Sequence, residues 1–244
     1  DRAWIALHGR GGEDGSIQGA LDYLGLPYTG SDVLSCALAM DKVKSKKLWQ
    51  QSGLPTASYQ VAVQTSQVDY QHGSFDYPVF VKPALEGSSI GITKVMNQSG
   101  LAEALTKAWE SGCDALIEEY LPGDEVTVAI LNDKALPVIR LEVANEFYDY
   151  AAKYVLDSTN YHCPSGLTKS LESEVQGIAE RAFETLGCSG WGRVDLKFDE
   201  HGKPNLLEAN LVPGMTDHSL VPMAASAAGI DFNDLVVRIL ETSL

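Results

Sequence analysis

The sequence predicts a mixed fold, with an α/β unit over residues 1–55 and a larger α+β unit over residues 56–244. An apolar run at residues 3–7 leads into a glycine-rich loop and a helical segment, which is the order of an α/β unit. Short strand patterns dominate the rest of the chain, with amphipathic helical segments between them. The length of 244 residues is enough for one large or two ordinary domains.

The composition is that of an acidic globular protein. Hydrophobic residues make up 45% and charged residues 21% of the chain, which argues against disorder. The 18 basic and 33 acidic residues give a formal net charge of −15. This balance predicts no nucleic-acid partner and no membrane partner, while a local basic pocket for a phosphorylated ligand stays compatible with it.

The cysteines and the first residues predict a cytoplasmic protein. The four cysteines are far apart and show no metal or redox spacing, so we expect reduced thiols. The chain starts without a basic segment followed by an apolar one, which is not the pattern of a secretory signal.

The first 55 residues are expected to hold one strand and two helices. Residues 3–7 read as a buried strand, and the glycine-rich loop 8–15 follows it. Helices are predicted at residues 16–24 and 41–51, the second ended by Gly53 and a proline.

The larger unit alternates strands and helices. Strands are predicted at residues 59–63, 78–82, 92–96, 115–119, 125–131 and 135–143. Apolar residues recur at helical spacing in residues 99–109 and 168–186. The polar, tyrosine-rich stretch 144–166 has the length of a lid or binding loop. Two strands and two helices are expected to complete the chain.

Two strands near the C-terminal end carry the most informative pattern. Because side chains alternate along a strand, Arg193 and Asp195 share one face, and Glu208 and Asn210 share a face of the next strand. A symmetric hairpin register sets Asp195 near Glu208, with Cβ atoms about 5 Å apart. Two carboxylates and an amide oxygen are hard ligands that suit Mg²⁺ and a nucleotide's phosphates. A solvated polar sheet face is the alternative.

A second pattern joins a lysine to a loop of small residues. The apolar strand 78–83 delivers Lys82, and the loop 86–91 is rich in glycine and serine. Small residues let backbone N–H groups approach phosphate oxygens, and serine hydroxyls add donors. The order of residues is not that of a Walker loop, and an ordinary hairpin turn explains the loop equally well.

A basic helix start is the third pattern. Four of the 18 basic residues fall within residues 42–47. Lys42 lies in the first helical turn, where the helix dipole also favours an anion. For Lys44, Lys46 and Lys47 we expect a solvated helix face.

Three weaker patterns remain ambiguous. The strand end at residues 116–125 could hold an adenine and a ribose, but a plain strand end with its turn is favoured. In residues 213–220, Gly214 offers an unhindered N–H for an oxyanion and Ser219 is expected to cap the following helix, although ordinary strand-to-helix punctuation also fits. His8 alone is more often a structural histidine than a binding one.

Taken together, these segments resemble the D-alanine–D-alanine ligases of the ATP-grasp superfamily. The matching strings occur in family order along the whole chain: ALHGRGGEDG at 6–15, MDK at 40–42, VKP at 81–83, EGSS at 86–89, YDYAAKY at 148–154, GRVD at 192–195, LEAN at 207–210, PGMT at 213–216 and HSL at 218–220. The resemblance implies an ATP-grasp architecture with a partial N-terminal α/β domain.

The resemblance also implies site residues. The phosphates of ATP would contact Lys42, Lys82, Ser88 and Lys153. The adenosine would be held by Glu118, Leu121 and Glu125. Two Mg²⁺ ions, with Mn²⁺ as the substitute, would be held by Asp195, Glu208 and Asn210. The D-alanine subsites would be lined by His8, Tyr154, Arg193, Gly214, Ser219 and Leu220. Catalytic roles would fall to Arg193, Ser88, Gly214 and Tyr154, beneath a closing loop at residues 148–161.

The implied reaction joins two D-alanines through an acyl phosphate, for peptidoglycan precursor synthesis. The family implies a cytoplasmic enzyme, with a homodimer as one assembly it allows. Three departures stand out. Family members begin with a further segment of about fifty residues, a strand, a turn and a helix, which carries a glutamate that anchors the first D-alanine. Glu119 stands where lysine is common, and residues 211–212 are apolar where small hydroxyl residues are common.

Two other functions therefore stay open. One is a chain that binds nucleotide but cannot ligate, because its first-substrate subsite is incomplete. The other is an ATP-grasp ligase with D-lactate or another amino acid as second substrate. Tyr154 resembles the dipeptide-forming members, which favours an amine nucleophile.

Overall fold

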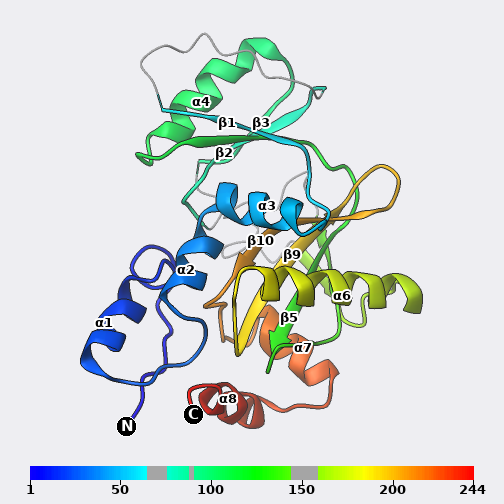
Figure 1. Cartoon of the computed structure of the whole chain (residues 1–244). Coiled ribbons are helices and arrows are strands. Elements are labelled where there is room, and N and C mark those ends of the chain that lie inside the picture. The colour runs from blue at the N-terminus through cyan, green and yellow to red at the C-terminus, as the bar shows by residue number, and fades with distance from the viewer. Residues whose placement is uncertain (65–75, 88–90, 144–158) are drawn as a thin grey trace.

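Two antiparallel sheets and the helices packed on them make up the protein, as a computed structural model shows (Figure 1). The structure describes residues 1–64, 76–87, 91–143 and 159–244. The smaller sheet has the strand order β1–β4–β2–β3, and the larger has the order β10–β9–β5–β7–β8, with β6 paired to β5. Helix α3 lies between the two sheets in the view.

The smaller sheet is covered by one amphipathic helix. Its strands are β1 (Tyr59–Ala62), β2 (Val79–Pro83), β3 (Thr93–Val95) and β4 (Ala115–Glu119). Helix α4 (Leu101–Trp109) follows a short 3-10 turn, η1 (Gln98–Gly100), and buries Leu101 and Leu105 against Val79 and Ile117. The predicted strands and the predicted apolar helix face are confirmed, with ends that differ by one or two residues.

The larger sheet confirms three predicted strands, β5, β9 and β10, and corrects two details. Its strands are β5 (Glu125–Leu131), β6 (Lys134–Ala135), β7 (Ile139–Val143), β8 (Thr159–His162), β9 (Trp191–Phe198) and β10 (Pro204–Asn210). The single strand predicted at 135–143 is wrong: it is divided into β6 and β7 around Pro137, whose ring nitrogen has no N–H for a ladder. Strand β8 was not predicted and lies inside the expected loop 144–166; residues 144–158 of that loop lie outside the described residues.

One face of the larger sheet forms the main core. Val126 and Val194 point to this face and pack with residues of α6 (Lys169–Thr185) and α3 (Lys42–Gln51). Trp49 of α3 is fully buried there, and its indole N–H donates to the Ala182 carbonyl at 3.1 Å. This contact fixes α3 against the sheet, so the lysines on α3 have defined positions.

The opposite face is covered at one end only. Helices α7 (Leu220–Ala227) and α8 (Phe232–Glu241) pack on Ala129, Leu131 and Trp191 of this face. Among the described helices, none alone is long and apolar enough to span a membrane, although α7 and α8, bent by 107°, pass that test as a pair. At the other end the same face carries polar side chains, which form the site described below.

The first residues depart from the prediction. Helix α1 (Ser16–Leu24) is confirmed, and Asp41 caps α3 by accepting from the Lys44 N–H at 3.0 Å. Helix α2 (Val33–Met40) was not predicted, although Asp32 caps it by accepting from the Ser35 N–H at 2.8 Å.

The strand predicted at residues 3–7 is wrong. The segment makes one isolated parallel bridge, between Ala3 and Tyr28, and the Leu7 residue is 55% exposed. A strand needs a neighbouring ladder along its length, but beyond Ala3 the described backbone hydrogen bond of this segment runs from the Ile5 N–H to a side chain, the Thr29 hydroxyl, at 3.2 Å. Apolar sequence without a pairing partner therefore does not become a strand here.

Candidate functional site

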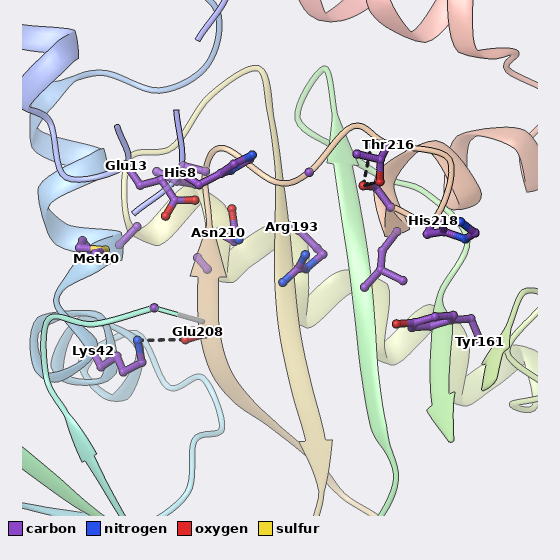
Figure 2. A pocket seen from close by; sticks show the side chains of 17 residues that line it. His8, Glu13, Met40, Lys42, Tyr161, Arg193, Glu208, Asn210, Thr216 and His218 are labelled. Atoms are coloured by element: carbon purple, nitrogen blue, oxygen red, sulfur yellow. Dashed lines mark hydrogen bonds and ion pairs between the residues drawn. The ribbon is translucent and has the colours of Figure 1, made fainter. Parts of the chain in front are cut away.

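The hairpin of β9 and β10 presents the predicted polar residues on one face. The register pairs Glu208 with Asp195 and Asn210 with Arg193, as the alternation of side chains predicts. Figure 2 shows Arg193 and Asn210 side by side on neighbouring strands, with Glu208 below them. Thr127 of β5 is paired with Asp195 on its other side.

A β-bulge aims the second strand. The register shifts between Leu206 and Glu208, which leaves Leu207 as the extra residue. Leu206 is fully buried in the main core. Residues two apart in a regular strand share a face, so Glu208 would point into the core with Leu206 if Leu207 took an ordinary place in the ladder. The bulge therefore places Glu208 and Asn210 on the polar face, and the sequence analysis did not foresee it.

Both opposed carboxylates are neutralised by cations of the chain. Asp195 accepts two bonds from the Arg193 guanidinium, from Nε and Nη2, each at 2.8 Å, and one from the Thr127 hydroxyl at 2.6 Å. A Glu208 oxygen lies 3.0 Å from the Lys42 ammonium. The repulsion expected between facing carboxylates is thus offset by Lys42 and Arg193.

The donors of Asp195, Glu208 and Asn210 fit a hard divalent ion. All three offer oxygen, and the first two are neighbours in the register. Within the described ranges no group of three His, Cys, Asp or Glu could hold a metal, so the amide of Asn210 is needed as the third ligand. That amide oxygen accepts from the Val212 N–H at 3.1 Å. A bound ion would therefore replace hydrogen bonds and ion pairs that these three side chains make in the structure.

A pocket opens beside these strands. It brings together eight predicted site residues: His8, Lys42, Arg193, Glu208, Asn210, Gly214, Ser219 and Leu220. Five other predicted residues do not line it: Lys82, Glu118, Leu121, Glu125 and Asp195. Predictions for Ser88, Lys153 and Tyr154 lie outside the described residues.

Two loops form the wall of the pocket. The His8 ring lies with Nδ1 2.7 Å from the Val212 carbonyl oxygen, so Nδ1 carries the proton and a neutral ring keeps its lone pair on Nε2. A Cβ at Gly214 would come within 2.8 Å of the Ser219 hydroxyl, so a larger residue there would require that hydroxyl to move. Ser219 stands at the start of α7, but its hydroxyl accepts from the Thr216 N–H at 2.8 Å and makes no cap bond. Ser219 therefore occupies the expected N-cap position of α7 but lacks the side-chain bond of a cap.

The interpretation of Lys46 as solvated is also wrong. Lys46 is 0% exposed, and its ammonium forms an ion pair with Glu118. Lys44 and Lys47 are exposed, as expected. Residues four apart share a helix face, so Lys42 and Lys46 both face the interior. That spacing was the available signal.

Glu118 lies between two lysines. One carboxylate oxygen faces Lys46, and the other accepts from the Lys82 ammonium at 2.5 Å. Further along, Leu121 is buried, and Glu125 shares the polar sheet face with Thr127, 3.7 Å from the Lys197 ammonium. The Glu118 carboxylate is therefore engaged by lysines in this structure.

Several pocket residues were not predicted. They include Glu13, Met40, Tyr161, Thr216 and His218. Glu13 accepts from the Gly9 N–H at 2.7 Å, and burial raises the pKa of its carboxyl above 4.5 despite that bond. Glu13 and Met40 lie inside the matching strings, whereas Tyr161 comes from the strand β8 that the sequence analysis missed.

The buried Glu118 gives the protein a defined acid sensitivity. Burial alone would raise the pKa of this carboxyl, but Lys46 and Lys82 outweigh burial and hold the pKa below 4.5. A lowered pKa contributes stability that is fully present above pH 4.5 and is lost as the pH falls through the folded-state value. We expect Glu118→Gln to lower the free energy of unfolding by about 3 kcal/mol at pH 7, because two buried lysines lose their carboxylate.

Urea unfolding of both proteins between pH 7 and pH 3.5 measures this effect. The difference between wild type and Glu118→Gln should shrink as the pH drops below 4.5. Glu103→Gln, at an exposed position on α4, is the control and should change stability by no more than about 0.5 kcal/mol. A difference that stays constant with pH would contradict the assignment.

Two antiparallel sheets, with lysines and carboxylates where they meet, place the chain in the ATP-grasp class. The family model described as the C-terminus of D-Ala–D-Ala ligase matches residues 48–241. The chain belongs to the D-alanine–D-alanine ligase family.

Relatives match over the whole length of the chain. It is 54% identical to the D-alanine–D-alanine ligase of Idiomarina loihiensis, over 100% of this chain and 80% of the relative. It is 53% identical to that of Nitrosococcus oceani, over 100% of this chain and 77% of the relative. The crystal structure of the Bacillus anthracis ligase complexed with ATP is similar, with a TM-score of 0.84, 34% identity and coverage of 100% of this chain and 79% of that one.

Proposed function

We propose that this chain joins two D-alanines in an ATP-dependent ligation, as part of peptidoglycan precursor synthesis. The observation that carries the proposal is the meeting of Asp195 and Glu208 with Lys42 and Arg193 beside one pocket. Family membership supports the same reaction. We place the enzyme in the cytoplasm, where ATP is available.

In the first step, the carboxylate of one D-alanine attacks the γ-phosphorus of ATP. The bond to the β,γ-bridging oxygen breaks, which gives an acyl phosphate and ADP. Lys42 and Lys82 supply positive charge for the phosphates, since phosphoryl transfer is accelerated mainly by positioning and by electrostatic stabilisation. Ser88 and Lys153 are assigned to the phosphates on the family resemblance alone.

In the second step, the amine of another D-alanine attacks the acyl carbon. The tetrahedral intermediate collapses with loss of phosphate, and the nitrogen gives up a proton. Arg193 and the Gly214 N–H are proposed to stabilise the oxyanion, a role in which donors are worth most when they are already oriented. The bonds from Arg193 to Asp195 provide that orientation. His8, Ser219 and Leu220 are proposed to line the D-alanine subsites.

Asp195, Glu208 and Asn210 are the proposed magnesium ligands. Bound Mg²⁺ would offset the negative charge of the phosphates. Lys42 and Arg193 now pair with two of these ligands, so both cations lie next to the place where a charged substrate would bind.

The test is a stoichiometric assay. The protein is incubated with ATP, MgCl₂ and D-alanine. The amount of released phosphate is measured, and the product is identified and quantified by mass spectrometry. We expect one D-alanyl-D-alanine per phosphate and no product from L-alanine. ATP binding without turnover would instead identify a chain that cannot ligate. If an equal mixture of D-alanine and D-lactate gave a depsipeptide as the main product, the second substrate would be D-lactate and not D-alanine.

A further inference from the structure

A lysine outside the pocket is built into the interior between the two sheets. Lys46 is fully buried, a rare state for lysine unless its charge is paired. Its ammonium contacts three elements: the Glu118 carboxylate of β4, the Thr56 hydroxyl at 2.5 Å, and the ring of Tyr59 on β1, 5.6 Å from the centroid. A lysine held from three sides has a fixed position.

The contacts of Lys46 lead to both sheets. On one side, the Glu118 carboxylate bridges Lys46 and Lys82 of β2, with one of its oxygens 2.5 Å from the Lys82 ammonium. On the other side, the Thr56 hydroxyl donates to the Leu206 carbonyl of β10 at 2.9 Å. Leu206 immediately precedes the bulge that aims Glu208. Lys46 therefore connects Lys82 to the strand that carries a proposed metal ligand.

Charge in this region is unbalanced. We define the lysine cluster as Lys42, Lys46 and Lys82 with Glu118 and Glu208; Lys42 pairs with Glu208, while Lys46 and Lys82 share Glu118. Its ammonium groups outnumber its carboxylates by one. A buried cation without a matching anion is costly, so the cluster favours an anionic ligand. Phosphate groups are anions of the right kind.

Sharing Glu118 keeps Lys82 electropositive. With Lys46 present, one carboxylate serves two ammonium groups, so neither is fully neutralised. Without Lys46, the same carboxylate would pair with Lys82 alone, and a phosphate would have to compete with it. The shared carboxylate also fixes where the Lys82 ammonium lies, because Lys46 holds its other oxygen.

We infer that Lys46 is a positioning residue, which acts through Glu118 to aim the Lys82 ammonium at the phosphates of a bound nucleotide. The inference rests on the proposed function in one respect, namely that the nucleotide is ATP. Lys46 itself touches no substrate in this role.

The test compares the affinities of Lys46→Met for ATP and for adenosine. Methionine is unbranched and apolar and fills the space of the lysine stem, and Glu118 keeps Lys82 as its partner in this variant. We expect calorimetric titration of the whole chain with ATP to show binding weakened at least about tenfold, the effect of one charge-assisted contact, and adenosine binding changed less than about twofold. Lys47→Met, at an exposed position one residue along the same helix, should leave both affinities unchanged.

Each other outcome is decisive. Unchanged ATP affinity in Lys46→Met overturns the inference, and so does an equal loss for ATP and adenosine, which would mean a merely structural role. If Lys46→Met does not fold, Thr56→Val decides, because it removes one hydroxyl contact of Lys46. Thr56→Val should weaken ATP binding about threefold and leave the affinity for adenosine unchanged. An unchanged ATP affinity in this variant would also overturn the inference.

The readout is independent of ligation. A wild type that binds ATP but makes no D-alanyl-D-alanine would contradict the proposed function while the Lys46 comparison remained valid. A wild type that does not bind ATP would overturn both.

Discussion

Asp195→Asn should lower D-alanine-dependent phosphate release by roughly 10³-fold, the upper range for loss of one electrostatic group in a catalytic site. Asparagine keeps the shape of the side chain and can still accept from the Thr127 hydroxyl, but it carries no charge. It can therefore neither hold a divalent ion well nor keep the paired bonds from Arg193. The fold should persist, because the neighbouring core residues Val194 and Leu196 are unchanged.

Phosphate release and circular dichroism, measured side by side, check this expectation. Asp199→Asn is the matched control, since Asp199 lies in the turn just after β9 and its carboxylate accepts from the backbone N–H groups of His201 and Lys203 in that turn. It should retain wild-type turnover. Full activity in folded Asp195→Asn would remove the basis for the metal assignment.

Arg193→Met should lower kcat about 100-fold, or roughly 3 kcal/mol in the barrier, while the KM for ATP changes little. The guanidinium is proposed to act on the oxyanion of the second step, after ATP has been bound. The substitution also removes the guanidinium partner of the buried Asp195 carboxylate, which keeps its bond from the Thr127 hydroxyl. Arg193→Lys keeps the charge but not the two-pronged geometry, so we expect it to recover only part of the rate.

Steady-state kinetics with varied ATP and varied D-alanine separate the two parameters. Arg181→Met, at an exposed position on α6, controls for the loss of one arginine and should behave as wild type. If the defect of Arg193→Met lay entirely in the KM for ATP, Arg193 would belong with the nucleotide and not with the oxyanion.

The parts of the fold that were predictable from sequence depend on local periodicity. The hairpin of β9 and β10 is an example, because alternation groups Arg193 with Asp195 and Glu208 with Asn210, although the bulge that pairs Glu208 with Asp195 was not predicted. Helix α6 is another, since its apolar spacing and its Thr168 cap, which accepts from the Leu171 N–H at 3.3 Å, are both visible in the letters. Local rules succeed where each residue's environment is set by its immediate neighbours.

The errors arose where distant partners decide the outcome. The segment at residues 3–7 is apolar enough for a strand, but only one bridge pairs with it. Lys46 looks like a surface lysine until Glu118, 72 positions away, is brought beside it by the smaller sheet. The eight predicted residues that line the pocket were recognised through the order of family motifs; spacing alone left most of those segments ambiguous.

The extra residue at Leu207 makes the number of amino acids in β10 as important as their identity. Deleting Leu207 would remove the bulge and place Glu208 directly after Leu206, where alternation still points the two side chains to opposite faces. Inserting a residue there would instead move Glu208 along β10, away from Asp195. Tolerance to substitution and tolerance to insertion or deletion are thus separate properties of this segment. A library of substitution variants, all of the same length, would test tolerance to substitution and would give no information on tolerance to insertion or deletion.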